Sequence, residues 1–140
     1  MADKTSLDVV DILRAYLSTS VLMTDPLKPN GILCKFQRPF NSVKEDVVIN
    51  SLVQGRGQIS EGVLNVNIFV LNLSFTAGGV VDNTQPNVPR LKYLLGLASE
   101  AMSEVFGLDY NFEVQQDNIF PDTNNQHYVN LKVEFTSINY

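Results

Sequence analysis

The sequence has few charges and few of the residues that usually carry chemistry. Of its 140 residues, 18% are charged, one is cysteine and one is histidine. The single Cys34 cannot form an internal disulfide bond, which suits a reducing compartment. Its apolar neighbours favour a small core residue over a reactive thiol. With one histidine and one cysteine there is no Cys/His cluster at metal-site spacing, so we expect no metal and no cofactor.

Long apolar runs and basic patches are also missing. No stretch approaches the roughly 18 consecutive apolar residues of a membrane-spanning helix, and the first residues lack the apolar run of a signal peptide. The net charge is −5, whereas tight DNA-binding proteins present a basic patch. No linker rich in Gly, Ser or Pro divides the chain. We therefore expect one domain over residues 1–140, with neither membrane insertion nor tight DNA binding.

Apolar residues and asparagine are plentiful instead. Apolar residues make up 44% of the chain, which is ordinary for a globular protein. Because charged residues are depleted at the centres of protein interfaces, a surface rich in amides suits broad protein contacts. The same composition also fits an ordinary domain with a polar surface.

Two amphipathic helices are predicted. The first runs from about residue 6 to 20, where Thr5 and Asp8 form a relative of the capping box and apolar residues recur at spacings of three and four. The second begins near Pro89, which suits a first helical turn, and Gly107 predicts its end.

Strands are predicted by short apolar or alternating segments. In the longest strand, one face carries Leu64, Val66, Ile68 and Val70, and the other face carries Asn65 and Asn67. Segments 74–88 and 117–126 show no period and are expected as loops; a loop as long as 74–88 is usually functional or disordered. The result is an α+β fold, a mostly antiparallel sheet of four to five strands with two helices packed on one face. The expected strands are 32–36, 47–52, 63–73, a strand beginning at 112–116, and 128–136.

Tests for catalytic motifs are negative. The glycines at 55 and 57 lack the pattern of a phosphate-binding loop and favour a hairpin turn. His127, at the start of a strand, is expected at the surface. Lys44, Glu45 and Asp46 could form an acid–base cluster, but they precede a strand, where charges usually mark a solvated loop. Paired carboxylates need burial or crowding to shift their pKa, and the sequence gives no sign of burial. We therefore expect that the protein is not an enzyme.

Three segments carry a resemblance to a known family. They are residues 38–52 (RPFNSVKEDVVINSL), 62–70 (GVLNVNIFV) and 87–91 (NVPRL). Through them, and through the order helix, strand, hairpin, loop, helix and strands, residues 5–138 resemble the tail terminator and tail completion proteins of tailed bacteriophages and their neck-joining relatives.

The resemblance implies a structural virion protein without catalytic residues. Such a protein forms a ring, commonly of six subunits, at the head-proximal end of the tail or in the neck, and DNA passes through it. Its neighbours would be neck, portal-side or tail-tube proteins, and assembly would occur in the cytoplasm of the bacterial host. An acidic subunit agrees with weak, repulsive contacts to passing DNA.

Ring closure needs a heterologous interface, in which two different patches of one subunit meet. We expect residues 54–61 and 74–88 to contact neighbouring subunits. Exposed apolar side chains in the second segment need a covering partner, unless Phe75 folds back onto the domain's own core. The residues expected at the subunit or ring interface are Arg38, Lys44, Glu45, Asp46, Arg56, Asn65, Asn67, Phe75, Val80, Val81 and Arg90.

Two other interpretations stay open. The chain could be a non-viral module that binds a peptide or protein on the polar face of the long strand or at a sheet edge. It could also be an enzyme whose site is assembled between subunits, which would require His127 or the 44–46 cluster beside a pocket.

Overall fold

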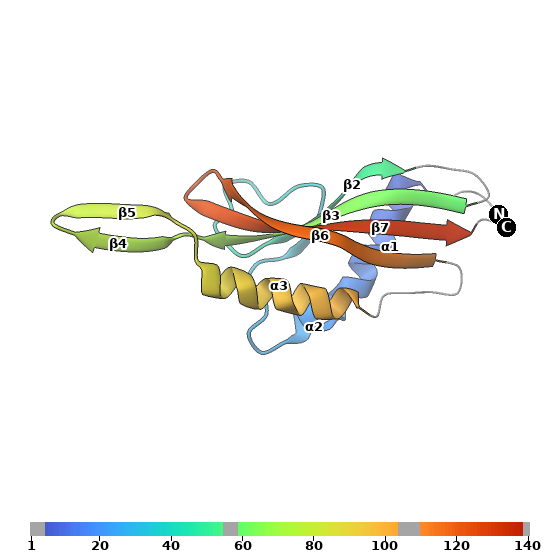
Figure 1. Cartoon of the computed structure of the whole chain (residues 1–140), viewed down its shortest axis with the longest axis horizontal. Helices are drawn as coiled ribbons and strands as arrows, with labels where there is room; N and C mark the ends of the chain where they lie inside the picture. The colour runs from blue at the N-terminus through green and yellow to red at the C-terminus, as the bar shows by residue number, and fades with distance from the viewer. Residues whose placement is uncertain (1–4, 55–58, 104–109, 139–140) are drawn as a thin grey trace.

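The computed structural model describes residues 5–54, 59–103 and 110–138. Within these ranges the chain forms a five-stranded sheet, a separate two-stranded ribbon and a layer of helices (Figure 1). The helices are α1 (Ser6–Ser18), α2 (Val21–Thr24) and α3 (Val88–Met102). The strands are β1 (Leu33–Lys35), β2 (Val47–Gln54), β3 (Ile59–Leu71), β4 (Leu73–Ala77), β5 (Val80–Gln85), β6 (Tyr110–Asp122) and β7 (Gln126–Ile138).

The large sheet has the strand order β1-β2-β3-β7-β6. Only β1 and β2 are parallel; the other neighbours are antiparallel. β3 and β7 form its centre and pair without a register shift from Ile59 opposite Ile138 to Leu71 opposite Gln126. The predicted α+β fold with a mostly antiparallel sheet is therefore confirmed.

The core lies between one face of this sheet and the helices. On β3, Leu64, Val66 and Ile68 are fully buried, as the alternation predicted. They pack with apolar residues of α1 and α3, so both predicted helices cover the same face. Each fully buried aliphatic side chain contributes about 1.5–3 kcal/mol, which makes this layer the main source of stability. The other face, which we call the outer face, carries no helix (Figure 1).

The helix ends agree closely with their sequence signals. Thr5 and Asp8 form a complete capping box, and α1 ends at Ser18, two residues earlier than expected. A short helix, α2, follows that the periodicity did not predict, because four residues are too few to show a period. Asn87 caps α3, which ends at Met102. Gly107, where we expected the helix to stop, lies outside the described residues.

The segment 74–88 is not a structureless loop, and that expectation was wrong. β4 and β5 form a hairpin whose turn is Gly78-Gly79, with φ of +59° and +78°. Both glycines adopt the left-handed conformation that a two-residue hairpin turn requires. The strands went unrecognised because neither face of the hairpin is buried, so no alternation of apolar and polar residues marks them.

The segment 117–126 was also wrongly expected as a loop. β6 runs through to Asp122, and only the turn at 123–125 is loop. A register shift between Val114 and Gln116 interrupts the alternation of faces. Such a bulge, on an edge strand with mostly exposed side chains, removes the pattern by which strands are recognised. No helix in the described ranges is long and apolar enough to cross a membrane.

Candidate functional site

A row of asparagines crosses the outer face of the sheet. The Asn65 amide nitrogen donates to the Asn50 oxygen at 3.1 Å, which joins β3 to β2. The Asn130 amide nitrogen donates to the oxygens of Asn65 and Asn67, at 3.0 and 2.6 Å, and joins β7 to β3. The two predicted interface residues Asn65 and Asn67 therefore belong to a half-buried amide ladder within the subunit. The ladder makes this part of the outer face polar, and Lys132, directly opposite Asn65 on β7, places a charge beside it.

The connection between β1 and β2, residues 36–46, lies over one end of this face, and we call it the crossover loop. Arg38 of the loop stacks its guanidinium on the Phe69 ring, 4.0 Å from the ring centre. Phe69 is thereby buried, while Leu71 further along β3 is 43% exposed. The Phe69 ring also contacts Tyr128, with 5.0 Å between ring centroids. The asparagine face of β3 is therefore half open and half covered, and the cover is the chain's own loop.

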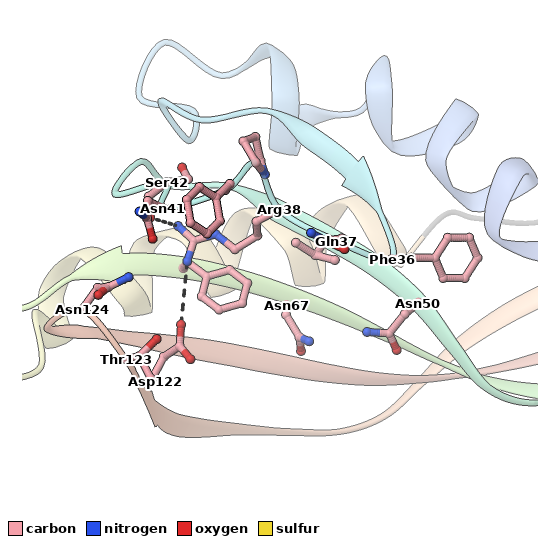
Figure 2. Close-up of a pocket in the computed structure, with 14 residues that line it drawn as sticks. Phe36, Gln37, Arg38, Asn41, Ser42, Asn50, Asn67, Asp122, Thr123 and Asn124 are labelled. Atoms are coloured by element: carbon pink, nitrogen blue, oxygen red, sulfur yellow. Dashed lines mark hydrogen bonds and ion pairs between the residues drawn. The ribbon is translucent and has the colours of Figure 1, made fainter.

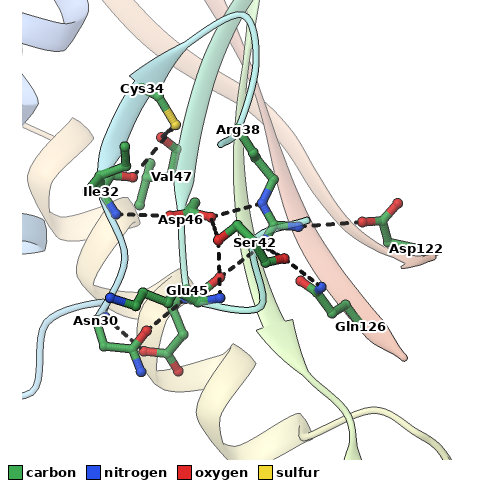
Figure 3. Close-up of polar contacts among 11 residues, drawn as sticks. Asn30, Ile32, Cys34, Arg38, Ser42, Glu45, Asp46, Val47, Asp122 and Gln126 are labelled. Carbon is green, nitrogen blue, oxygen red and sulfur yellow. Dashed lines mark hydrogen bonds and ion pairs between the residues drawn. The ribbon is translucent and has the colours of Figure 1, made fainter. Parts of the chain in front are cut away.

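Asp46 holds the crossover loop in place (Figure 3). Its side chain is almost completely buried and accepts three hydrogen bonds. The Ile32 amide donates to Oδ1 at 3.0 Å. The Arg38 Nε, at 3.0 Å, and the Ser42 hydroxyl, at 2.5 Å, both donate to Oδ2. The carboxylate lies at the end of the crossover loop. It therefore ties this end to Ile32, just before β1, and to Arg38, near the start of the loop.

Arg38 extends the network in two directions. Its guanidinium donates to the carbonyl oxygens of Ser42 and Lys44, at 3.2 and 2.9 Å. One nitrogen lies 3.7 Å from the Asp122 carboxylate at the end of β6. The Ser42 carbonyl also accepts a hydrogen bond from the buried Gln126 side chain at 3.1 Å. The loop is thus fastened to both strands of the β6–β7 hairpin.

The acidic residues before β2 do not form a solvated loop, and that interpretation was wrong. Burial by itself would raise the pKa of Asp46, but the hydrogen bonds from Ser42, Ile32 and Arg38 outweigh it and hold the pKa below its ordinary value. The sequence did not reveal this because the partners Arg38 and Ile32 lie 8 and 14 residues from Asp46, too far apart for a local pattern. Among the cluster, only Lys44 is exposed.

Gly31 permits the burial of Asp46. A methyl group on Gly31 would overlap the Asp46 carboxylate and the backbone of Glu45. The Gly31 amide also donates to the Glu45 carbonyl at 3.1 Å. Glycine is required here because the backbone approaches a carboxylate closely.

Glu45 forms a second anchor with α3. The Arg90 guanidinium donates to both carboxylate oxygens at 2.8 Å, a bidentate pair, and its remaining donors reach the carbonyls of Leu27 and Lys28. Burial alone would raise the pKa of Glu45, but the bonds from Arg90 and the Asn30 amide lower it overall. Four of the predicted interface residues, Arg38, Glu45, Asp46 and Arg90, therefore meet their partners inside the subunit.

A cleft of about 480 Å³ opens between the crossover loop and the outer face (Figure 2). Figure 2 shows Arg38, Asn41 and Ser42 on the loop side and Asn50, Asn67 and Asp122 on the sheet side. Two aromatic side chains of the loop line it, with Phe40 90% and Phe36 47% exposed. A cleft with amides inside and exposed aromatics at its margin suits an occupant that has both apolar side chains and hydrogen-bonding groups.

Phe36 adopts a rare backbone conformation at the start of this cleft. Its φ is +68°, and the Gln37 amide donates to the Lys35 carbonyl at 2.8 Å, so Phe36 is the central residue of a γ-turn. A bulky residue with positive φ is a genuine outlier, and such outliers persist where the surrounding structure enforces them. Here the Phe36 amide is held by the Ile49 carbonyl at 2.8 Å. No pattern in the sequence marks this turn.

The β4–β5 hairpin, residues 73–85, projects beyond the end of the large sheet, and we call it the arm (Figure 1). Phe75, Val80 and Val81 are 52%, 69% and 59% exposed. Phe75 does not fold back onto the core. The expectation that these residues need a partner to cover them therefore stands, although they lie on strands and not in a loop.

The root of the arm is tied to the sheet. The Asn72 backbone amide donates to the Asn125 carbonyl at 2.8 Å, and its side-chain amide donates to the Asn83 carbonyl at 2.9 Å. The Asn72 side-chain oxygen lies 2.6 Å from Nδ1 of His127. His127 is thus half-buried and positions the arm, where the sequence suggested a surface histidine. Cys34, expected in the core, is half-buried on the edge strand β1, and burial raises the pKa of its thiol.

The chemistry of these groups favours binding. Within the described ranges, no group of three or more His, Cys, Asp and Glu side chains is arranged to hold a metal ion. Asp46 and Glu45 are held ionised by arginines and hydrogen bonds, so neither has the raised pKa of a general acid. Arg56 and the central half of the predicted contact segment 54–61, residues 55–58, lie outside the part that the structure describes.

Comparison with models of protein families found no match, and comparison with curated protein sequences found none either.

Proposed function

We propose that this protein is a structural subunit of a tailed-phage particle. In this proposal it forms a ring at the head-proximal end of the tail or in the neck, as a tail terminator or tail completion protein, around the path of the DNA. The observation that carries the proposal is the arm, a projecting hairpin whose apolar side chains are exposed on the subunit.

An exposed hairpin of this kind is expected to have a partner. A two-stranded ribbon alone is marginally stable in water, and every side chain on the arm is exposed or only half-buried. Phe75 and Val80 lie on the same face of the ribbon. Val80 pairs with Ala77, and Ala77 is two residues along β4 from Phe75, so all three side chains point to one face. Because the root of the arm is fixed by Asn72 and His127, docking it costs less conformational entropy than ordering a free loop.

The charge distribution supports passage of DNA over retention. The net charge of the chain is −5. Arg38 and Arg90 form ion pairs with Asp46 and Glu45 within the subunit, and Lys35 forms an ion pair with Asp11. Because Asp and Glu outnumber Lys and Arg by 15 to 10, contacts to a DNA duplex are expected to be weak and repulsive.

The proposal is tested by the size and shape of the assembled protein. We expect ring-shaped particles in negative-stain images and a mass close to six subunits by sedimentation velocity. A free monomer that closes into rings only on a tail or neck template also agrees with the proposal. A reconstruction of a virion that shows this protein as an isolated single copy would contradict it.

A matched pair of variants tests the role of the arm. The triple variant Phe75→Ser, Val80→Ser and Val81→Ser removes the large exposed apolar side chains from both faces of the arm. The control carries three serines at Leu7, Leu27 and Val88, which are 61%, 59% and 53% exposed and lie off the arm. We expect both proteins to fold, and only the arm variant to lose assembly.

A second candidate is a non-viral peptide-binding module, and the cleft under the crossover loop is the observation that favours it. Such a protein would be a monomer that binds a partner at a defined one-to-one ratio. Light scattering of the complex distinguishes the two, because a ring subunit associates with further copies of itself.

A further inference from the structure

We propose that the arm of one subunit docks into the cleft of a neighbouring copy of the same chain. The inference rests on the proposed function for the presence of neighbouring copies. It adds the two surfaces that meet: the tip of the arm, and the cleft between the crossover loop and the outer face.

The cleft offers an excess of hydrogen-bond donors. The amide nitrogens of Asn50 and Asn67 donate no hydrogen bond within the described ranges, although their oxygens are occupied by Asn65 and Asn130. The side chains of Asn41 and Asn124, which also line the cleft, make no hydrogen bond there either. An occupant that satisfies these donors must bring acceptors, such as the carbonyl oxygens of an extended backbone.

The cleft also offers apolar surface. Phe40, at its margin, is 90% exposed, and Phe36 is 47% exposed. The crossover loop is fastened by Asp46 and Arg38, so these rings are presented by a rigid support. Exposed aromatic rings on a fixed loop have the properties of interface anchors. The preferred occupant therefore combines free backbone carbonyls with apolar side chains.

The arm has both features. β4 and β5 pair only with each other, so each has one edge of unpaired backbone N–H and C=O groups. Phe75, Ala77 and Val80 give one face of the ribbon its apolar character. Its only charged residue is Asp82, so no cation has to be desolvated beside Arg38.

The arm points away from its own subunit. It extends past the end of the large sheet (Figure 1), whereas the cleft lies between the crossover loop and the outer face (Figure 2). The root of the arm is tied to the sheet through Asn72. Arm and cleft are different patches of one chain, so their contact is heterologous, and repeated heterologous contacts form a ring when the rotation between subunits closes. A foreign peptide in the cleft would give a different cross-linked product, whereas a two-fold exchange of arms would give the same product in closed two-subunit particles.

Disulfide trapping between two single-cysteine proteins tests the inference. Both carry Cys34→Ser, which removes the one native thiol. One carries Val80→Cys on the arm and the other Phe40→Cys at the cleft. They are mixed in equal amounts at the highest soluble concentration, oxidised mildly, and the mixed dimer is quantified on non-reducing gels and identified by mass spectrometry.

The control partner carries Leu27→Cys, an exposed position on the helix side of the sheet. We expect at least five-fold more mixed dimer for Val80→Cys with Phe40→Cys than for Val80→Cys with Leu27→Cys. Equal yields would overturn the inference, as would capture of a different protein by Phe40→Cys in assembled particles.

The test separates this inference from the proposed function. Rings that form without the trapped pair would overturn arm docking and leave the ring function intact. An enriched trapped pair in closed two-subunit particles would support arm docking and contradict the ring.

Discussion

Arg38 and Asp46 lie eight residues apart in the chain and meet beneath the cleft, where the Arg38 Nε is 3.0 Å from the Asp46 carboxylate. The pair closes the crossover loop on itself, and the same guanidinium stacks on Phe69 of β3. The arginine therefore both neutralises a buried carboxylate and presses the loop against the sheet. This contact is one of several that hold the crossover loop over the cleft.

Removing the Asp46 charge should destabilise the protein strongly. Asp46→Ala leaves Arg38 without its buried partner, and breaking one side of a buried pair costs about 3–5 kcal/mol. Asp46→Asn keeps the shape and should cost less. The free energy of unfolding in urea measures both. As a control, Asp11→Asn disrupts the exposed pair with Lys35 and should change stability by at most about 1 kcal/mol.

Stability should fall in acid through Asp46 and Glu45. The pKa of each is lower in the folded protein than its ordinary value of 3.8 or 4.5. Each therefore contributes stability above its unfolded pKa, and this stability is lost as the pH falls through the lower folded pKa. Urea titrations at a series of pH values below about 5 measure the slope. The double variant Asp46→Asn, Glu45→Gln should show a shallower loss; an unchanged slope would contradict the assignment.

Gly31→Ala should destabilise the protein by about 1–3 kcal/mol, because the added methyl overlaps the Asp46 carboxylate and the Glu45 backbone. Gly96→Ala is the matched control. A methyl at Gly96, on the exposed side of α3, meets nothing within 4 Å and should stabilise the helix by up to about 1 kcal/mol. Thermal unfolding followed by circular dichroism compares them. Equal effects would show that Gly31 is not held against Asp46.

Arg90→Lys should weaken the anchor between α3 and the crossover loop. Lysine cannot replace the bidentate contact to Glu45 or reach the Leu27 and Lys28 carbonyls at the same time. We expect a loss of about 1–3 kcal/mol in the free energy of unfolding, from hydrogen bonds to charged groups. Arg14→Lys, on the exposed surface of α1, serves as the control and should be nearly neutral.

The isolated protein should not bind duplex DNA tightly. With a net charge of −5, and with Arg38 and Arg90 paired to carboxylates, we expect weak attraction to phosphates. Fluorescence anisotropy with a labelled duplex at about 150 mM salt should give no binding below about 1 μM, since even non-specific binders reach only about 10⁻⁴–10⁻⁶ M. Sub-micromolar affinity would contradict the proposed passage of DNA.

Elements whose signals are local could be predicted from the sequence. The capping box at Thr5 and Asp8, the asparagine cap and Pro89 of α3, and the alternation along β3 and β7 are repeated in the structure because each depends on residues within one or two turns or along one strand. From these elements the α+β class and the helical face of the sheet followed.

The positions at which the polar residues of the cleft meet could not be predicted from the sequence, because they depend on tertiary contacts. Asp46 accepts hydrogen bonds from Ile32 and Arg38, and Glu45 accepts them from Arg90, 45 residues away in the chain. No local sequence pattern therefore indicates that Asp46 and Glu45 are buried. The arm was missed for the opposite reason: its strands bury neither face in the subunit, so nothing imposes the alternation that marks a strand. Burial produces sequence patterns only where an element packs against its own chain, and both the arm and the outer face are left open to other molecules.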